Sequence, residues 1–271
     1  MEYPLRAERF DSFPPLKKAN FYWRIFATGL GFTLFGTGGL LLCATVFPAI
    51  ILTGKNADIR SHRVRLVIRF TFKVFLRILD FLGILHIESK NLDELMEMKG
   101  KLVICNHPSL LDVVIIISRL KNIQCVVNNK LWKNFFVGFI VRAAGYIRND
   151  IPPEVFLERC TSLLAKGENI IIFPEGTRSI PGQALKFQRG FANLAIFAKA
   201  DIQSLCLNCK PIMLIKGAKW YDIPPRRAVF TLQAGPQFSF KNYNDGAPRS
   251  LAVRSLMRDI QQFYEENLNH A

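Results

Sequence analysis

One stretch of the sequence restricts the fold more than any other: the 30 residues from Ile25 to Gly54 contain no charged side chain. As one straight helix it would be roughly 45 Å long, whereas the hydrocarbon core of a bilayer is roughly 30 Å thick. Several glycines interrupt its first half, and Pro48 lies near its end. We therefore expect an interrupted helical segment that inserts into a membrane.

Basic residues flank this apolar run on both sides and bear on how it meets the bilayer. Those nearest to it are Lys17, Lys18 and Arg24 before it and Lys55 and Arg60 after it. A single span would place one basic flank outside, against the tendency of basic loops to stay in the cytoplasm. Two short helices that turn at Gly36–Gly39 would keep both flanks on one side, and we favour this monotopic insertion. A full span and a buried helical hairpin in the core are the alternatives.

The next stretch has the pattern of a basic amphipathic helix over about residues 60–82. Four basic side chains recur at four-residue steps and so share one helical face: Arg65, Arg69, Lys73 and Arg77. Such a helix suits the surface of an anionic bilayer, with core packing beneath a solvated basic face as the alternative. We therefore assign residues 1–90 to a membrane-anchoring segment and residues 91–271 to a second domain.

Residues 91–271 alternate between short apolar runs and amphipathic stretches, which is typical of an α/β domain. We expect strands at 102–105, 123–127, 169–173, 204–207, 212–215 and 229–234, helices at 110–120, 131–144, 153–166, 187–200 and 248–268, and a polar helix and turn at 91–101. The expected fold class is α/β: a central mixed sheet flanked by helices, preceded by the membrane-inserted helical segment.

The composition narrows the partners of the chain. Its formal net charge is +15, half of its residues are hydrophobic and 23 are Phe, which excludes a disordered chain and points to an anionic partner. A membrane fits that charge, whereas no zinc finger, RNA-binding strand motif or basic–aromatic interleaving supports nucleic acid. Cys206 and Cys209 form a lone C-x-x-C without a second pair of ligands, so we expect no metal site.

The first candidate chemical motif lies where the expected strand 102–105 ends and a helix begins. Its sequence is Asn106-His107-Pro108-Ser109-Leu110-Leu111-Asp112. A histidine ahead of the helix could fold back toward the carboxylate, which would hold one ring nitrogen and leave the other free as a base. A capping histidine with a solvent-facing aspartate is the alternative.

The second motif, Phe173-Pro174-Glu175-Gly176-Thr177-Arg178-Ser179, follows the expected strand 169–173. Arg178 offers a planar fork matched to phosphate oxygens, Gly176 lets the backbone approach a ligand, and Thr177 adds a hydroxyl. Glu175 could order the loop or bind a substrate hydroxyl. An ordinary surface turn with an Arg–Glu pair is the alternative.

Together the two motifs resemble those of the glycerolipid acyltransferases, the 1-acylglycerol-3-phosphate acyltransferase-like family. Residues 106–112 are similar to the first motif of that family and residues 173–179 to its third, and Phe187 and Gly190 match a following F-x-x-G. The resemblance covers roughly residues 85–240. It implies that His107 is the general base of an acyltransferase and that Asp112 orients it.

The resemblance also implies where the acceptor lipid binds. The candidate substrate-binding residues are Asn106, Arg148, Glu175, Gly176, Thr177 and Arg178. Glu175, Gly176 and Arg178 would bind the phosphate or polar head. The second motif of the family departs here, because Ile151 stands where an arginine is usual, and Arg148 could substitute from a nearby position. That departure, with a fourth motif in which Pro211 is displaced, puts the identity of the acceptor in question.

We therefore expect a membrane-associated O-acyltransferase that needs no bound cofactor. It would move a fatty acyl group from acyl carrier protein or coenzyme A to the hydroxyl of a lysophospholipid such as 1-acylglycerol-3-phosphate. Basic surface near the site would help to capture either anionic donor. The expected location is the bacterial inner membrane, with the catalytic domain on the cytoplasmic face. A different lipid acceptor, in lysophospholipid remodelling or on a glycolipid, and a non-catalytic binder of anionic lipid are the alternatives.

Overall fold

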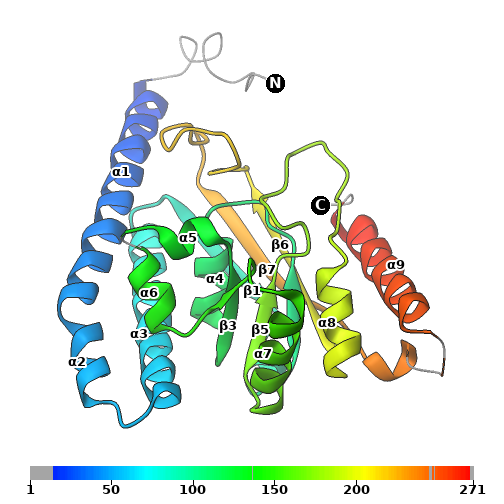
Figure 1. Ribbon diagram of the computed structural model, residues 1–271. Coiled ribbons are helices and arrows are strands. Elements are labelled where there is room, and N and C mark those ends of the chain that lie inside the picture. Colours follow the sequence, from blue (N-terminus) through cyan, green and yellow to red (C-terminus); the bar gives the residue numbers. More distant parts are fainter. Residues whose placement is uncertain (1–14, 136, 244–245, 247, 269–271) are drawn as a thin grey trace.

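A seven-stranded mixed sheet forms the centre of the computed structural model, which describes residues 15–268 apart from 136, 244–245 and 247 (Figure 1). In chain order the strands are β1 (Leu85–Lys90), β2 (Leu102–Cys105), β3 (Ile123–Val127), β4 (Ile147–Arg148), β5 (Asn169–Ile172), β6 (Ile202–Lys210) and β7 (Ala228–Phe238). Across the sheet they follow the order β1-β7-β6-β2-β5-β3-β4. β7 runs antiparallel to β6, and all other neighbours are parallel, so the expected mixed α/β sheet is confirmed.

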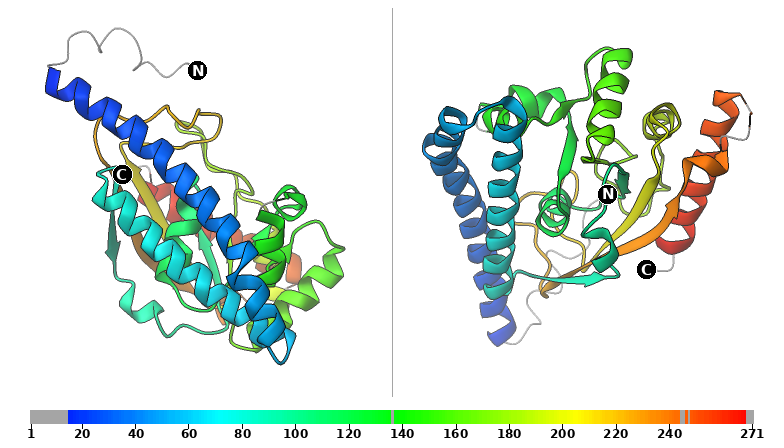
Figure 2. Two further views of the ribbon diagram at one scale, coloured as in Figure 1. Left: turned by 90° about the vertical axis from the view of Figure 1, so that its left-hand side faces the viewer. Right: turned by 90° about the horizontal axis from the view of Figure 1, so that it is seen from below.

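Helices cover both faces of this sheet. They are α1 (Pro15–Ala44), α2 (Val46–Thr53), α3 (Ala57–Phe81), α4 (Asp112–Arg119), α5 (Asn129–Lys133), α6 (Val137–Ala143), α7 (Pro153–Ala165), α8 (Gly190–Ala198) and α9 (Arg249–Leu268). Successive side chains of a strand point to opposite faces, and β2 accordingly places Val103 in the core beneath α3 and α4 and Ile104 in the core beneath α7, α8 and α9. Figure 2 shows α1–α3 and α9 on opposite sides of the molecule.

The expected turn at Gly36–Gly39 is wrong, because α1 continues through these glycines to Ala44, α2 extends the helical segment to Thr53, and the chain reverses only between Gly54 and Asn56, ahead of α3 (Figure 1). A glycine costs a helix about 1 kcal/mol, which packing against a neighbour can outweigh. Phe35 of α1 lies 6.0 and 5.3 Å from two α3 rings, measured between centroids. At Gly31, a Cβ atom would come 2.9 Å from an α3 leucine. The glycine there allows close helix packing rather than ending the helix.

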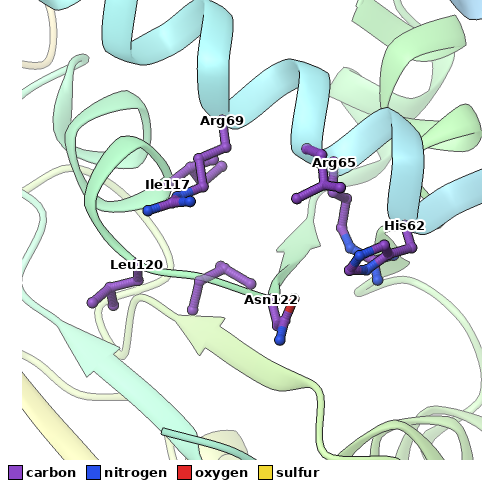
Figure 3. Close-up of a pocket in the computed structure, with 8 residues that line it drawn as sticks. His62, Arg65, Arg69, Ile117, Leu120 and Asn122 are labelled. Atoms are coloured by element: carbon purple, nitrogen blue, oxygen red, sulfur yellow. The ribbon is translucent and has the colours of Figure 1, made fainter. Parts of the chain in front are cut away.

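Only Lys73 and Arg77 of the basic row of α3 are exposed, whereas its spacing predicts one exposed face that includes Arg65 and Arg69. Arg65 is buried and pairs with Glu168 of the domain, and Arg65 also donates to the Ala144 carbonyl. Figure 3 shows Arg65, Arg69 and His62 around a small pocket that α3 forms with the end of α4 and the start of β3. The exposed row is instead largely apolar and consists of Leu66, Phe70, Val74, Ile78 and Phe81. The face expected to meet anionic lipid is therefore partly turned into the protein.

The remaining differences are local. The segment expected to be a strand at 212–215 is a loop, since Leu214 has φ +53°, which no strand accommodates. The helix expected at 131–144 is two helices, because the Asn134 side chain accepts from the Val137 amide and begins α6. The polar helix expected at 91–101 is a short 3₁₀ turn at Asp93–Leu95. β1 and β4 were not expected, and β1 places the start of the sheet before residue 91.

Candidate active site

The two sequence motifs meet at one edge of the sheet. β2 ends just before His107 and β5 just before Phe173, and these strands are adjacent and parallel, with Ile104 paired to Ile172. The carboxyl ends of adjacent parallel strands in α/β folds are a common place for ligands. The topology therefore brings together two segments that are far apart in the sequence.

His107 and Asp112 form a buried dyad. The His107 Nδ1 lies 2.7 Å from Asp112 Oδ2, and that oxygen also accepts from the Ser109 amide at 2.7 Å. An ionised carboxylate only accepts, so Nδ1 carries the shared hydrogen, and a neutral ring then leaves Nε2 with its lone pair. Asp112 is the first residue of α4 and is fully buried, while the His107 side chain is 17% exposed. The arrangement presents a base toward solvent and excludes the capping alternative.

Burial raises the pKa of Asp112 from 3.8 to about 6, since a carboxylate loses its hydration in the core. The hydrogen bond from His107 and its charge lower the pKa, but less than burial raises it. The Asp112 carboxyl thus changes protonation near pH 6, close to the pH at which a general base is most useful.

Glu175 joins the second motif to the first. Its Oε1 accepts from the His107 amide at 3.0 Å and from the Ser179 hydroxyl at 2.8 Å. The Ser179 amide donates to the His107 carbonyl at 2.7 Å, and the Phe173 ring stacks on the His107 ring with 4.2 Å between centroids. These contacts hold the backbone and the imidazole of His107 from the β5 side. Glu175 orders the loop, the first of its two expected roles.

Arg178 lies on the same loop and is anchored at one nitrogen. Its Nη1 donates to the carbonyls of Leu214 and Ile215 at 3.0 and 3.1 Å. Within the described part of the chain its Nε and Nη2 have no hydrogen-bond partner, so one edge of the fork remains for an anion. Gly176 has φ +68°, which favours glycine, and Thr177 is exposed beside it. Residues 212–215, whose carbonyls accept from Arg178, were expected to form a strand because they are apolar, so the sequence did not predict this contact.

The two other candidate binding residues have different surroundings. Asn106 is buried next to His107, and its side-chain amide exchanges two hydrogen bonds with the Leu207 backbone, at 2.7 and 2.8 Å, which ties β2 to β6. Arg148 lies on β4, three strands or roughly 14 Å from β2. It makes a bidentate ion pair with Asp150 and lies over the Trp132 ring. The structure does not bring Arg148 to His107.

The described residues also include other groups that could take part in metal or nucleophilic chemistry. No group of three His, Cys, Asp or Glu side chains among these residues could hold a metal ion. Burial raises the pKa of Cys206 to about 11 and that of Cys209 to about 12, so both remain thiols at neutral pH. Ser109 is fully buried, and its hydroxyl oxygen accepts from the Leu111 amide. Among the described residues, no hydrogen bond joins any of these three side chains to the imidazole of His107.

Comparison with known proteins finds similarity to acyltransferases. The acyltransferase family profile matches residues 86–208. A 1-acyl-sn-glycerol-3-phosphate acyltransferase from Cocos nucifera is 32% identical over 111 residues, which are 38% of this chain and 36% of the relative. The enzyme of that name from Helicobacter pylori is 30% identical over 135 residues, 48% of this chain and 54% of the relative. The chain thus spans from about a third to about half of these relatives.

A solved structure shares the fold over most of the chain. The 1-acyl-sn-glycerophosphate acyltransferase from Thermotoga maritima has a TM-score of 0.63 and 16% identity, and the alignment covers 91% of this chain and 97% of that one. The family match includes the His107 dyad and the Arg178 loop, and the sheet joins them at one edge. Over residues 86–208 the chain is therefore similar to the acyltransferase family, and over most of its length it shares the fold of a solved 1-acyl-sn-glycerophosphate acyltransferase.

Proposed function

We propose that the protein transfers a fatty acyl group from an acyl thioester of acyl carrier protein or coenzyme A to the hydroxyl of a lysophospholipid such as 1-acylglycerol-3-phosphate. The observation that carries this proposal is the His107–Asp112 dyad, held 2.7 Å apart beside the loop of Arg178. A base and an anion-binding fork at one sheet edge suit an acceptor that has both a hydroxyl and a phosphate.

Transfer begins at the acceptor hydroxyl. His107 Nε2 removes its proton as the oxygen attacks the thioester carbonyl carbon, and the imidazolium that forms is stabilised by Asp112. A positioned base of this kind typically contributes 10²–10⁴-fold to the rate. The new C–O bond gives a tetrahedral intermediate whose negative charge lies on the former carbonyl oxygen.

Collapse of that intermediate completes the exchange. The carbonyl reforms, the C–S bond breaks, and the departing sulfur takes the proton from His107 Nε2. The products are an ester and a free thiol, and the dyad returns to its starting state. The free edge of Arg178 holds the acceptor phosphate during these steps, which aligns the hydroxyl with His107.

The lipid acceptor requires access to a membrane, and α1 to α3 supply a surface for it. Lys18–Thr53 is long and apolar enough to cross a bilayer, and its most apolar stretch of 18 residues has a mean hydropathy of 2.0 and is almost entirely unburied. We propose that α1 and the apolar row of α3 lie in one leaflet, because α1 packs along α3 and Arg24 near its start bonds to the domain. Lys73 and Arg77, exposed on α3, then meet anionic headgroups.

The test uses the purified full-length protein with labelled acyl-carrier-protein and acyl-coenzyme A thioesters and a panel of lysolipid acceptors. We expect turnover with lysophosphatidic acid that the His107→Ala variant loses by at least 100-fold. Full activity of that variant would overturn the catalytic role of the dyad. Turnover with phosphate-free alcohols alone would overturn the phosphate role of Arg178.

A further inference from the structure

A basic groove lies on the side of the sheet away from α1–α3. It is lined by Arg189, from the segment just before α8, and by α9 residues that include Arg254, Met257, Arg258 and Glu265. Three arginines against one carboxylate give the lining a positive charge, and the partly exposed Met257 places an apolar side chain among them. An apolar contact with a charged rim is typical of protein interfaces.

Two of these arginines are available to a partner. Neither Arg189 nor Arg254 has an ion pair or a side-chain hydrogen bond within the described part of the chain, and both are exposed. Arg258 pairs only with its neighbour Asp259, through one nitrogen at 3.2 Å. Because like charges side by side repel, a cluster of this kind favours an acidic partner.

Short connections link the groove to the site. The residue before Arg189 is Gln188, whose amide donates to the Pro174 carbonyl at 2.7 Å, and its side chain borders Gly176. From α9, the Tyr264 hydroxyl lies 2.8 Å from the Leu205 carbonyl of β6 and 3.1 Å from the Ile104 carbonyl of β2, and it donates its one hydrogen to this pair. The segment that supplies Arg189 to the groove therefore contacts, one residue earlier, the loop that follows β5.

The location of the groove distinguishes a soluble partner from a lipid. The exposed apolar residues of α1 and α3 lie across the sheet from α9 (Figures 1 and 2). With that apolar surface on the bilayer, the groove faces water. Anionic headgroups would meet the α3 side, and the groove would meet acidic proteins in solution.

We propose that this groove docks an acidic acyl carrier protein, which delivers the acyl thioester to His107 from the aqueous side. The inference rests on the proposed function, since it names the donor of that reaction and the surface that recognises it. Met257 contacts the carrier surface, while Arg189, Arg254 and Arg258 bind its carboxylates. The thioester arm then passes along the Gln188 side of the loop.

The experiment compares one acyl chain on two donors, acyl carrier protein and coenzyme A, with the full-length protein in nanodiscs. The test variant is R254E/R258E. The matched control is K90E/K241E, which makes the same change in net charge on exposed lysines of β1 and the 3₁₀ turn at Phe240–Tyr243. We expect the test variant to lower the ratio of kcat/KM for the carrier protein to that for coenzyme A at least tenfold, and the control to change it less than twofold.

Other outcomes overturn the inference. The inference fails if the test variant lowers kcat/KM equally for both donors, or if the control variant has the same effect as the test variant. It also fails if the wild type uses coenzyme A alone. Binding of holo-acyl carrier protein to the nanodiscs, measured without turnover, gives a second readout: we expect it to weaken as salt rises from 50 to 300 mM and in R254E/R258E. If neither donor is used but this binding persists, the proposed function fails and the docking surface stands. If binding is unaffected by the variant, the docking surface fails.

Discussion

At the scale of single residues, the buried Asp112 carboxyl links stability to catalysis. Its pKa is about 6 in the folded protein and 3.8 in a model peptide, so the folded state favours the protonated form. The stability that this preference contributes is complete below pH 3.8 and is lost as pH rises through 6. At pH 7.5 the protein therefore holds an ionised carboxylate that is unfavourable for folding.

Asp112→Asn should consequently raise stability at pH 7.5 while it removes activity. Two pKa units correspond to on the order of 3 kcal/mol, which is the upper bound of the gain. Asp112 Oδ1 has no partner among the described residues, so an amide nitrogen there loses no existing bond. Chemical denaturation at pH 7.5 and pH 4 checks the sign. A variant that is less stable than the wild type at both pH values would contradict it.

The same carboxyl predicts the acidic side of the pH–rate profile. Below about pH 6 the dyad holds an additional proton, and no base is available for the acceptor hydroxyl. We expect kcat/KM to fall about tenfold per pH unit well below that value and to level off above it. Initial rates from pH 4.5 to 8.5 measure this limb. A profile that is flat through pH 6 would exclude the dyad as the base.

Glu175 is predicted to act by positioning His107. Glu175→Ala removes the acceptor for the His107 amide and the Ser179 hydroxyl, and small misplacements of a base can lower rates by on the order of 100-fold. We expect kcat to fall at least tenfold with the KM for the acceptor within about threefold. Glu175→Gln keeps an acceptor oxygen and should restore most of kcat. A rise in KM alone would assign Glu175 to acceptor binding instead.

At the scale of elements, the sequence predicted what is local and periodic and missed what depends on neighbours. The apolar runs at β2, β3 and β5 and the dyad at the start of α4 were predicted, because burial and helix capping are determined nearby. The inward turn of Arg65 was not, since only its partner Glu168, 103 residues away, makes that burial favourable. The path of Leu214 was missed for a similar reason: its carbonyl accepts from the distant Arg178.

The apolar row of α3 leads to a prediction about membrane binding. Phe70 and Phe81 are 67% and 91% exposed, and burial of one such ring in lipid contributes about 1.5–3 kcal/mol. Phe70→Asp/Phe81→Asp should therefore weaken binding to anionic vesicles at least tenfold in a flotation assay. Val155→Asp/Leu251→Asp, on α7 and α9, alters two side chains of about 50% exposure on the other face and should bind as the wild type does. An equal loss of vesicle binding in the two double variants would contradict the assignment of the apolar row of α3 as the membrane-binding surface.

At the scale of the whole molecule, one buried guanidinium connects the apolar helix α1 to the segment that contacts Arg178. Arg24 of α1 donates to the carbonyls of Gly83 and Ile84, between α3 and β1, and to that of Pro224. The segment that ends at Pro224 also packs on α1, where Trp220 contacts Phe32. The same segment begins at the carbonyls that bind Arg178. Residues 214–224 thus contact both α1 and Arg178, and we expect a change in α1 to affect Arg178 through them.

Arg24→Ala should loosen both ends of this connection. It leaves the carbonyls of Gly83 and Pro224 without a donor, whereas the Ile84 carbonyl keeps the Ala228 amide, and each buried unpaired group costs about 1–3 kcal/mol. We expect a lower melting temperature, faster hydrogen exchange in residues 214–224 and a several-fold higher KM for the acceptor, because Arg178 loses a fixed support. Arg226→Ala, an exposed arginine next to that segment, is the matched control and should change none of the three. If exchange accelerates in α1 alone, α1 anchors the protein without supporting the site; if residues 214–224 loosen while KM stays constant, Arg178 does not hold the acceptor.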